Sequence, residues 1–298
     1  MPTTTLRGVY VPLITPFAAD GSVALDALER LAHEYLDAGA AGLVPLGTTG
    51  EAPLLDAAEK HAVVELCARV GREHGAQVIV GTGTNHTAST VASTQDYGAI
   101  PGVTHAMVVV PYYVRPSQAG IVAHISTAAE ASPVPVVIYN IPVRTGRVLE
   151  VAGMLELATL ENVVGVKQAV DGIDLATVEV LAAAPPGFAV LGGDDAYLFP
   201  TVLLGGSGAI CASAHVCTER FVAMIECGLA GKVDEGRAHH EALLPVVKAC
   251  FAEPNPSVFK AVLHAQGRIP TPDLRLPLLA ASPEARDRAL AAIDASSR

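Results

Sequence analysis

The segment ENVVGVKQAV (residues 161–170) ends a short apolar run on a lysine. The apolar run covers residues 163–166, and three of these four residues are the β-branched Val163, Val164 and Val166. The run therefore has the composition of a buried strand. Lys167 stands where this strand would leave the protein interior. The fold therefore depends on how many similar strands the chain contains, and the function on why a lysine ends this one.

Similar apolar runs recur along the chain. The eight strand candidates are GVYVPLI (8–14), GLVPL (42–46), QVIVG (77–81), HAMVVV (105–110), VPVVIY (134–139), VVGVK (163–167), FAVL (188–191) and SGAIC (207–211). The segments between them have helical periodicity, and this alternation predicts parallel strands joined by crossover helices. Eight such units fit a closed (β/α)8 barrel, which typically needs about 250 residues. An open doubly wound sheet is the rival fold, but we find no nucleotide-binding glycine loop.

Helices replace strands after Cys211. Helical segments are expected over residues 218–230 and 232–251 and from residue 255, with the first closing the barrel. The Pro-rich segment 269–283 is expected to run extended over the surface before a last short helix. We therefore predict an α/β protein with a barrel domain at residues 1–225 and a helical C-terminal appendage at residues 226–298.

Composition excludes several classes of protein. The net charge is −11, from 30 acidic and 19 basic residues, and no basic run exists that would bind nucleic acid. The segment MPTTTLRGVY lacks the features of a signal peptide, and all apolar runs are shorter than about 18 residues, so we expect a cytoplasmic protein without a membrane partner. Five scattered cysteines without a CxxC motif indicate reduced, mostly buried thiols.

Lys167 is the exceptional lysine of the five. Reactive groups of barrel enzymes lie at the carboxyl ends of the strands, and Lys167 alone closes a strand. Lys60, Lys232, Lys248 and Lys260 lie in helix-like stretches with polar neighbours. Lys167 either reaches solvent or an acidic partner, or it forms a Schiff base whose iminium draws electrons from the adjacent carbon. Burial would favour the neutral amine that this attack on a carbonyl requires.

Polar loops follow other predicted strands. In GTTGE (47–51), Thr48 and Glu51 have the spacing of a helix capping box, and the loop can also cradle a carboxylate. Tyr113 in VPYYVRPSQ and Tyr139 in IYNIPVRTG either relay protons or cover the core. Arg144 offers a planar fork for a substrate carboxylate or forms a surface salt bridge.

Two further segments have simpler interpretations. The glycines of LGGDD (191–195) and LGGSGAI (204–210) permit close approach of a small ligand, whereas Asp194 or Asp195 is expected to cap a helix. His239, His240 and Glu241 are adjacent on a predicted helix. Adjacent residues do not share a helix face, so no metal site is expected there.

Taken together, GTTGE, PYYxRPSQxG, YNIPxRTG, GVK, GDD and EPNPxxxK resemble the dihydrodipicolinate synthase / N-acetylneuraminate lyase family, in family order over about residues 6–280. The resemblance implies a (β/α)8 barrel with a helical C-terminal region, usually assembled as a homotetramer of tight dimers. It also implies pyruvate and a small aldehyde as substrates. No cofactor and no metal are required, because the iminium is the electron sink.

The resemblance assigns catalytic roles to four residues. Lys167 matches the lysine that forms a Schiff base with pyruvate. Tyr139 matches the phenol that shuttles protons, linked through the Thr48 hydroxyl to Tyr113. In the family the second tyrosine crosses into the site of the neighbouring subunit, which makes the dimer a requirement for catalysis.

Four more residues match substrate-binding positions. Thr49, with the Thr48 backbone, corresponds to the site of the pyruvate carboxylate. Arg144 resembles the arginine that receives the carboxylate of the aldehyde substrate. The backbone at Gly192 and Ile210 is expected to line the pocket.

The Thr-Thr pair, the Tyr-Tyr pair and the RTG after YNIP favour the synthase branch of the family. This implies a lyase that condenses pyruvate with L-aspartate 4-semialdehyde to 4-hydroxy-tetrahydrodipicolinate, in lysine and diaminopimelate biosynthesis. The alternatives are a sister aldolase that acts on a sugar-derived 2-oxo acid through the same Lys167 adduct, and a non-catalytic oxo-acid sensor.

The chain departs from the family pattern at several positions. Gln168 stands where many members have an acid, Cys211 where Ser is common and Val114 where Asn is frequent. Members that are inhibited by lysine bind it through a His/Glu set. The matching positions hold Ala57, Lys60 and Ser89 here, which predicts weak or absent inhibition by lysine.

Overall fold

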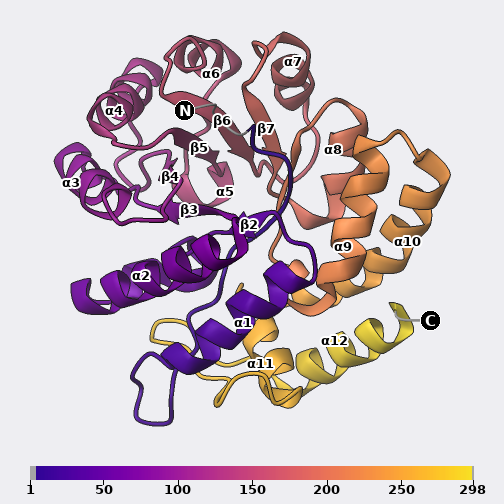
Figure 1. Ribbon diagram of the computed structural model, residues 1–298. Coiled ribbons are helices and arrows are strands. Elements are labelled where there is room, and N and C mark those ends of the chain that lie inside the picture. Colours follow the sequence, from indigo (N-terminus) through magenta and orange to yellow (C-terminus); the bar gives the residue numbers. More distant parts are fainter. Residues whose placement is uncertain (1–4, 297–298) are drawn as a thin grey trace.

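The segment around Lys167 forms strand β6, one of eight parallel strands that close into a barrel in sequence order. The strands are β1 (Gly8–Val11), β2 (Gly42–Leu43), β3 (Gln77–Gly81), β4 (His105–Val109), β5 (Val136–Asn140), β6 (Val163–Gln168), β7 (Ala189–Gly192) and β8 (Gly208–Ile210). Pairing of β1 with β8 completes the ring, and Figure 1 shows the strands enclosed by helices. All eight predicted strands and the closed barrel are confirmed, and the open-sheet alternative is wrong.

This computed structural model describes residues 5–296. Residues 1–4 lie outside the described part, and with them part of the amino-terminal segment that was examined for a targeting signal. Residues 297 and 298, at the end of the predicted helical region, also lie outside it. Within residues 5–296, no helix combines the length and the apolar character needed to cross a membrane.

Helices cover the outside of the barrel between successive strands (Figure 1). They are α1 (Leu25–Asp37), α2 (Ala57–His74), α3 (Thr87–Gly98), α4 (Gln118–Ala131), α6 (Val151–Leu157), α7 (Leu175–Ala183), α8 (Leu198–Leu203) and α9 (Ala214–Leu229). The short helix α5 (Pro142–Thr145) instead lies over the carboxyl ends of the strands. Helix α2 shows how the sequence fixes such an element. Asp56 and Glu59 form a capping box at its start, and Gly75 ends it in the left-handed conformation.

Alternate strand residues divide between two packing environments. Tyr10, Ile79 and Met107 belong to one buried cluster with residues of the other strands, which fills the barrel. Their neighbours Val78 and Val80 pack in a different cluster with the surrounding helices. Both faces of each strand are therefore apolar, which explains the continuous apolar runs in the sequence.

The C-terminal region packs against one side of the helical ring. It contains α10 (Val233–Cys250), α11 (Ser257–Ala265) and α12 (Pro283–Ser296), and α10 and α11 both contact α9 (Figure 1). Residues 269–282 contain neither helix nor strand, as predicted for the Pro-rich segment. The domain boundary predicted at residue 225 remains a proposal, and α9 continues four residues beyond it.

The cysteines are free thiols. Cys67, Cys211 and Cys250 are buried, and Cys217 and Cys227 are partly buried. The expectation of reduced and mostly buried thiols is confirmed for the described chain. Burial raises the pKa of Cys67 and of Cys250 to about 12, which makes both poor nucleophiles.

Candidate active site

The register of the barrel places Lys167 beside Tyr139. The two residues are paired across β5 and β6, and Leu191 of β7 is the partner of Lys167 on its other side. Lys167 is only 6% exposed, and its Nζ lies 4.3 Å from the centroid of the Tyr139 ring. The lysine that ends the sixth strand therefore does not extend into bulk solvent, and it contacts the phenol that was predicted to assist it.

Asp195 is a second buried ionisable group near Lys167. Its Oδ2 accepts a hydrogen bond of 2.6 Å from the backbone N–H of Ser213, just before α9. Burial raises the pKa of the Asp195 carboxyl, while the hydrogen bonds from Ser213 and the positive charge of Lys167 oppose that rise. The carboxyl is thus close enough to Lys167 to interact with its charge.

Asp194 or Asp195 was expected to cap a helix, but neither caps the turn that follows them; Asp195 instead binds the N–H of Ser213, the N-cap residue of α9. Asp194 precedes the short 3₁₀ turn η3 (Asp195–Tyr197) without a side-chain capping bond. Its Oδ2 instead accepts the N–H groups of Asp171 and Gly172, in the loop after β6. Both acids therefore connect loops at the carboxyl ends of neighbouring strands, where they stabilise the surroundings of Lys167.

A cavity of about 360 Å³ opens over the carboxyl ends of β2 to β5, and its size suits a small-molecule ligand. Of the predicted site residues, Thr48, Tyr139 and Arg144 line it. Tyr112, Asn255, Pro277 and Leu278 also line it. Tyr139 lines this cavity and its ring also contacts Lys167. Lys167 does not line the cavity itself and lies behind Tyr139 at its edge.

Arg144 is the exposed cation of this cavity. It lies in the last turn of α5, after the Pro142 that begins the helix, and Gly146 ends it in the left-handed conformation. Within residues 5–296 its side chain takes part in no ion pair, so the surface salt bridge is not observed. A guanidinium that lines a cavity without a protein partner can receive a substrate carboxylate.

The GTTGE loop does not form the capping box that its spacing suggested. It forms two short 3₁₀ turns, η1 (Thr48–Gly50) and η2 (Ala52–Leu54), without a side-chain cap. Thr49 is buried, and its hydroxyl accepts a hydrogen bond of 3.0 Å from Nδ2 of Asn255. The capping interpretation is therefore wrong. Thr48 lines the cavity and Thr49 does not, and the carboxylate cradle stays a prediction.

Tyr113 lies outside the cavity of its own chain. It is 87% exposed with a backbone φ of 70°, and Tyr112 lines the cavity in its place. No hydrogen bond joins the Thr48 hydroxyl to either predicted tyrosine within residues 5–296. A single chain therefore brings together Lys167, Tyr139 and Thr48 but leaves Tyr113 projecting outward.

Gly192 and Ile210 end β7 and β8, and neither lines the 360 Å³ cavity. Gly192 pairs with Gln168 and Ala209 across the sheet, and the Ile210 side chain packs inside the barrel. The strand ends are thus positioned as expected. A role of their backbone in binding substrate stays a prediction.

The departures from the family pattern lie away from the cavity. Gln168 is buried and bonds to Asn140 and to Thr177 of α7, on the opposite side of β6 from Lys167. Val114 is 56% exposed, and Cys211 is buried in the cluster that joins the strands to the helices. None of these three side chains contacts the space beside Tyr139.

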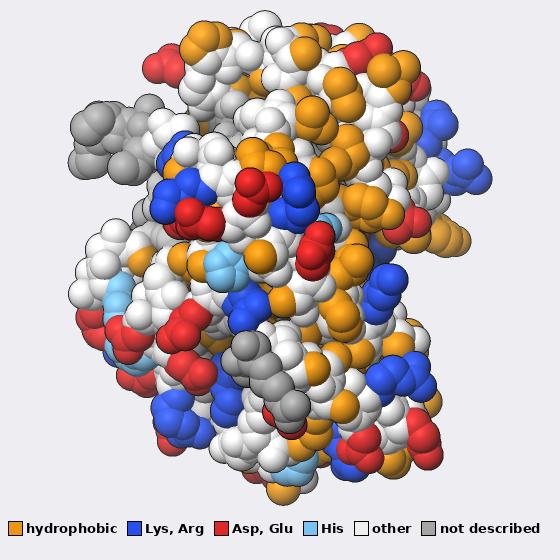
Figure 2. Space-filling view, turned by 90° about the vertical axis from the view of Figure 1, so that its right-hand side faces the viewer, with side chains coloured by type: hydrophobic (Ala, Val, Ile, Leu, Met, Phe, Trp, Pro, Cys, Tyr) orange, Lys and Arg blue, Asp and Glu red, His pale blue; other side chains and the backbone are white. Residues whose placement is uncertain are grey.

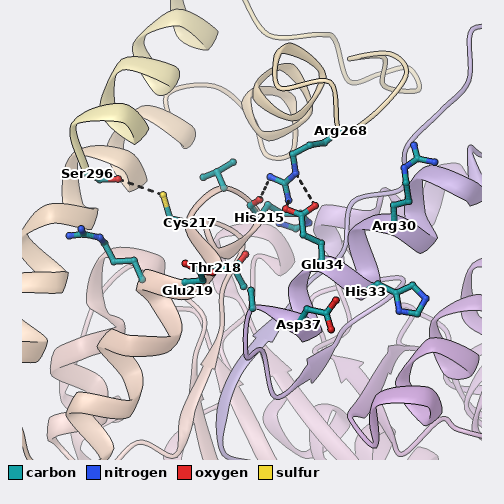
Figure 3. A pocket seen from close by; sticks show the side chains of 13 residues that line it. Arg30, His33, Glu34, Asp37, His215, Cys217, Thr218, Glu219, Arg268 and Ser296 are labelled. Carbon is teal, nitrogen blue, oxygen red and sulfur yellow. Dashed lines mark hydrogen bonds and ion pairs between the residues drawn. The ribbon is translucent and has the colours of Figure 1, made fainter. Parts of the chain in front are cut away.

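A second cavity of about 880 Å³ lies between α1, the start of α9 and the end of α12 (Figure 3). Its side chains mix acids and bases, and Arg268 is already bound to Glu34 at 2.8 Å and to the His215 carbonyl at 2.7 Å. None of the predicted site residues lines it. Of these two cavities, only the smaller one is lined by predicted site residues.

Sequence reasoning missed several residues of the site. Asn255, Pro277 and Leu278 come from the C-terminal region, which was expected to be an appendage, yet they line the cavity. Lys260 is fully buried, although its polar neighbours suggested a surface helix. The EPNPxxxK motif contains both Asn255 and Lys260 and was the one signal that could have indicated them. In residues 5–296 no three His, Cys, Asp or Glu side chains cluster closely enough to hold a metal ion.

Known proteins have similar sequences and the same fold. The model of the dihydrodipicolinate synthetase family matches residues 5–296. A 4-hydroxy-tetrahydrodipicolinate synthase of Moorella thermoacetica is 42% identical over 286 residues, which cover 96% of each chain. The dihydrodipicolinate synthase structure from Thermotoga maritima superposes with a TM-score of 0.94, at 32% identity and 99% coverage of both chains.

A third similar protein is the dihydrodipicolinate synthase of Acinetobacter baumannii, whose structure was solved in complex with pyruvate. It superposes with a TM-score of 0.94 at 30% identity, covering 98% of this chain and 99% of that one. Sequence and fold agree over essentially the whole length, and the chain belongs to the dihydrodipicolinate synthetase family.

Proposed function

We propose that this protein condenses pyruvate with L-aspartate 4-semialdehyde to give 4-hydroxy-tetrahydrodipicolinate. The observation that carries the proposal is the position of Lys167, buried at a strand end against the Tyr139 ring beside a cavity that suits a small molecule. The relatives named as 4-hydroxy-tetrahydrodipicolinate synthases support the same reaction. The enzyme would be a lyase of the cytoplasm that serves lysine and diaminopimelate biosynthesis.

The first step joins Lys167 to pyruvate. The neutral amine attacks the C2 carbonyl, and the carbinolamine that forms loses water to give an iminium. Tyr139 is the group placed to donate and accept the protons of this step, because its phenol lies beside the amine and faces the cavity. The iminium then acidifies the C3 methyl group, and loss of one proton gives an enamine.

The enamine carbon forms the new carbon–carbon bond. It attacks the aldehyde carbon of the second substrate, and the aldehyde oxygen takes up a proton to become the hydroxyl of the product. The amino group of the added substrate then attacks C2, which closes the ring and displaces the Lys167 amine. Over the whole sequence one water is released, and the free lysine is regenerated.

Substrate binding uses the loops around the cavity. The buried Thr49 hydroxyl and the Thr48 backbone would hold the pyruvate carboxylate. Arg144 would bind the carboxylate of the semialdehyde through its unpaired guanidinium. The backbone of Gly192 and Ile210, at the ends of β7 and β8, would border the pyruvate side of the site.

We further propose that the active form is a homotetramer built from tight dimers. Tyr113 projects from its own chain, which supports a role in the site of a neighbouring subunit, where it would join Thr48 and Tyr139. The face formed by α7 to α10 also carries exposed hydrophobic side chains, gathered in its upper part in Figure 2. Exposed hydrophobic side chains of α7, α8 and α10 include Leu175, Leu203 and Val233, and the surface of these helices would provide the contact between dimers.

The test combines trapping with turnover. Borohydride added with pyruvate should modify only the peptide that contains Lys167, and the enzyme should then be assayed with pyruvate and a panel of aldehydes. Preference for aspartate semialdehyde supports the synthase. Preference for a sugar-derived aldehyde would identify a sister aldolase, and trapping without turnover of any aldehyde would identify an oxo-acid sensor. Either of these last two results overturns the proposal.

A further inference from the structure

Lys260 and Glu51 form a buried ion pair between two distant parts of the chain. Lys260 belongs to α11, and Glu51 follows the Thr48–Thr49 loop after β2. The Lys260 Nζ lies 2.5 Å from Oε1 of Glu51, and neither side chain is exposed to solvent. The same Nζ donates to the Asp273 carbonyl at 2.9 Å and lies 4.0 Å from the centroid of the Phe17 ring.

Arg275 extends this contact to a third segment, the C-terminal strap (residues 269–282). Its backbone N–H donates to Oε2 of Glu51 at 3.0 Å, so each carboxylate oxygen has its own donor. Its guanidinium donates to the Leu54 carbonyl at 2.9 Å and forms an ion pair with Glu59. Glu51 therefore receives bonds from α11 and from the strap at once.

The same region of the chain reaches the substrate cavity. Asn255, five residues before Lys260, donates to the Thr49 hydroxyl, and Pro277 and Leu278 of the strap line the cavity. The loop that carries Thr48 and Thr49 is thus fixed from outside the barrel. The backbone of Glu51 itself has a φ of 54°, a left-handed conformation that is uncommon for a residue other than glycine. Its side-chain contacts hold that conformation.

Stability alone is a weak reason for this arrangement. Burying two charges costs solvation energy, and a buried ion pair can often be replaced by apolar residues without loss of stability. Burial lowers the pKa of Lys260 to about 8, whereas Glu51 opposes this and keeps the amine charged at neutral pH. Each charged group of the pair has defined hydrogen-bond partners. The pair joins the Thr48–Thr49 loop, α11 and the strap.

We infer that Glu51, Lys260 and Arg275 are positioning residues that fix the Thr48–Thr49 loop and the strap around bound pyruvate. None of the three touches the reacting atoms. The inference rests on the proposed function, because it assigns the pyruvate carboxylate to the Thr48–Thr49 loop. Small displacements of such a loop are costly, since a misplacement of about 1 Å can reduce the rate about 100-fold.

The test removes the charges without leaving one of them buried alone. The double variant Glu51→Gln/Lys260→Met keeps an acceptor for the Arg275 N–H, and Lys232→Met/Glu235→Gln is the matched control at an exposed pair 3.4 Å apart. Steady-state kinetics should show a fall of about 10- to 100-fold in kcat/KM for pyruvate, mostly through a higher KM. The control variant should keep wild-type values.

A second variant keeps the inference testable if the double variant fails to fold. Arg275→Gln releases the strap at a side chain that is 27% exposed, and the KM for pyruvate should rise severalfold. Folded variants with an unchanged KM, whether or not their melting temperature falls, would show that the network is merely structural. An inactive wild-type enzyme would instead contradict the proposed function.

Discussion

Lys167 and Lys260 are both buried, but within residues 5–296 Lys260 forms an ion pair and Lys167 does not. Lys260 in α11 contacts the Glu51 carboxylate at 2.5 Å, and its other close contacts are a carbonyl and an aromatic ring. Lys167 at the end of β6 lies against the Tyr139 ring and forms no ion pair within residues 5–296. Lys260 thus has a bonded counter-charge, whereas the Asp195 carboxyl near Lys167 forms no ion pair with it. Attack on a carbonyl requires a neutral amine, and an ion pair with a carboxylate disfavours that form. The comparison supports the two proposed roles, positioning for Lys260 and Schiff-base formation for Lys167.

The largest expected effect is the loss of the reactive amine. Lys167→Met should reduce kcat by at least about 1000-fold, because no other group can form the covalent intermediate. The control is Lys248→Met at an exposed helical position, which should retain full activity. Steady-state turnover of pyruvate and aspartate semialdehyde measures both. Activity of Lys167→Met near the wild-type level would show that the two lysines were assigned the wrong roles.

Removing the positioning lysine should act on stability first. Lys260→Met leaves the Glu51 carboxylate buried without its cation, which should cost about 3–5 kcal/mol of unfolding free energy. Adding Glu51→Gln should recover most of that loss, because no unpaired charge remains. Urea unfolding of the single and double variants measures the difference. Equal stability of the two variants would contradict a tightly paired Lys260.

His215 extends the comparison to a buried base that is kept neutral. Its Nε2 accepts the Ile14 N–H at 3.1 Å, and its Nδ1 contacts the Ala212 carbonyl at 2.7 Å. Burial lowers the pKa of His215 to about 4, and burial lowers the pKa of His105 to about 4 as well. Both values lie below the usual 6.5, so the unfolded chain binds these protons more tightly than the folded one.

Stability should therefore be complete above about pH 6.5 and fall as the pH decreases toward 4, by at most about 1.4 kcal/mol per pH unit for each histidine. Urea unfolding at several pH values measures this slope. His215→Asn should make it shallower, because asparagine offers an acceptor and a donor without titrating in this range. An unchanged slope in that variant would contradict a neutral, buried His215.

The smallest expected effect is that of added lysine. Ala57 and Lys60 lie in α2, and Ser89 lies in α3, where the resemblance assigns a His/Glu set to lysine-inhibited members. These side chains provide neither that histidine nor that carboxylate. Initial rates should therefore change little with millimolar lysine, and inhibition at micromolar concentrations would refute this prediction.

Local sequence was sufficient to predict the barrel and the position of Lys167 at the end of a strand. Each strand is a continuous apolar run because both of its faces are buried, so the eight runs and the position of Lys167 could be read directly. The structure of the GTTGE loop could not be predicted in this way. Glu51, which joins its two 3₁₀ turns, binds Lys260, 209 residues away in the sequence. A spacing rule for local capping does not include such a partner.

The remaining errors have the same origin. Asp194 and Asp195 bond to the backbone of other loops, which a pattern within their own segment does not reveal. The strap was recognised as extended, but its lining of the cavity through Pro277 and Leu278 follows from tertiary packing. The exposure of Tyr113 follows from the fold and could not be read from its own segment, and its role in a neighbouring subunit remains a proposal.

The most direct test of the central claim is a crystal structure of the protein soaked in pyruvate. We predict continuous electron density from the Lys167 Nζ to C2 of pyruvate, with the pyruvate carboxylate at Thr48 and Thr49 and the Tyr139 hydroxyl nearby. Pyruvate bound elsewhere, or present in this cavity with the Lys167 amine unbonded to it, would contradict the account.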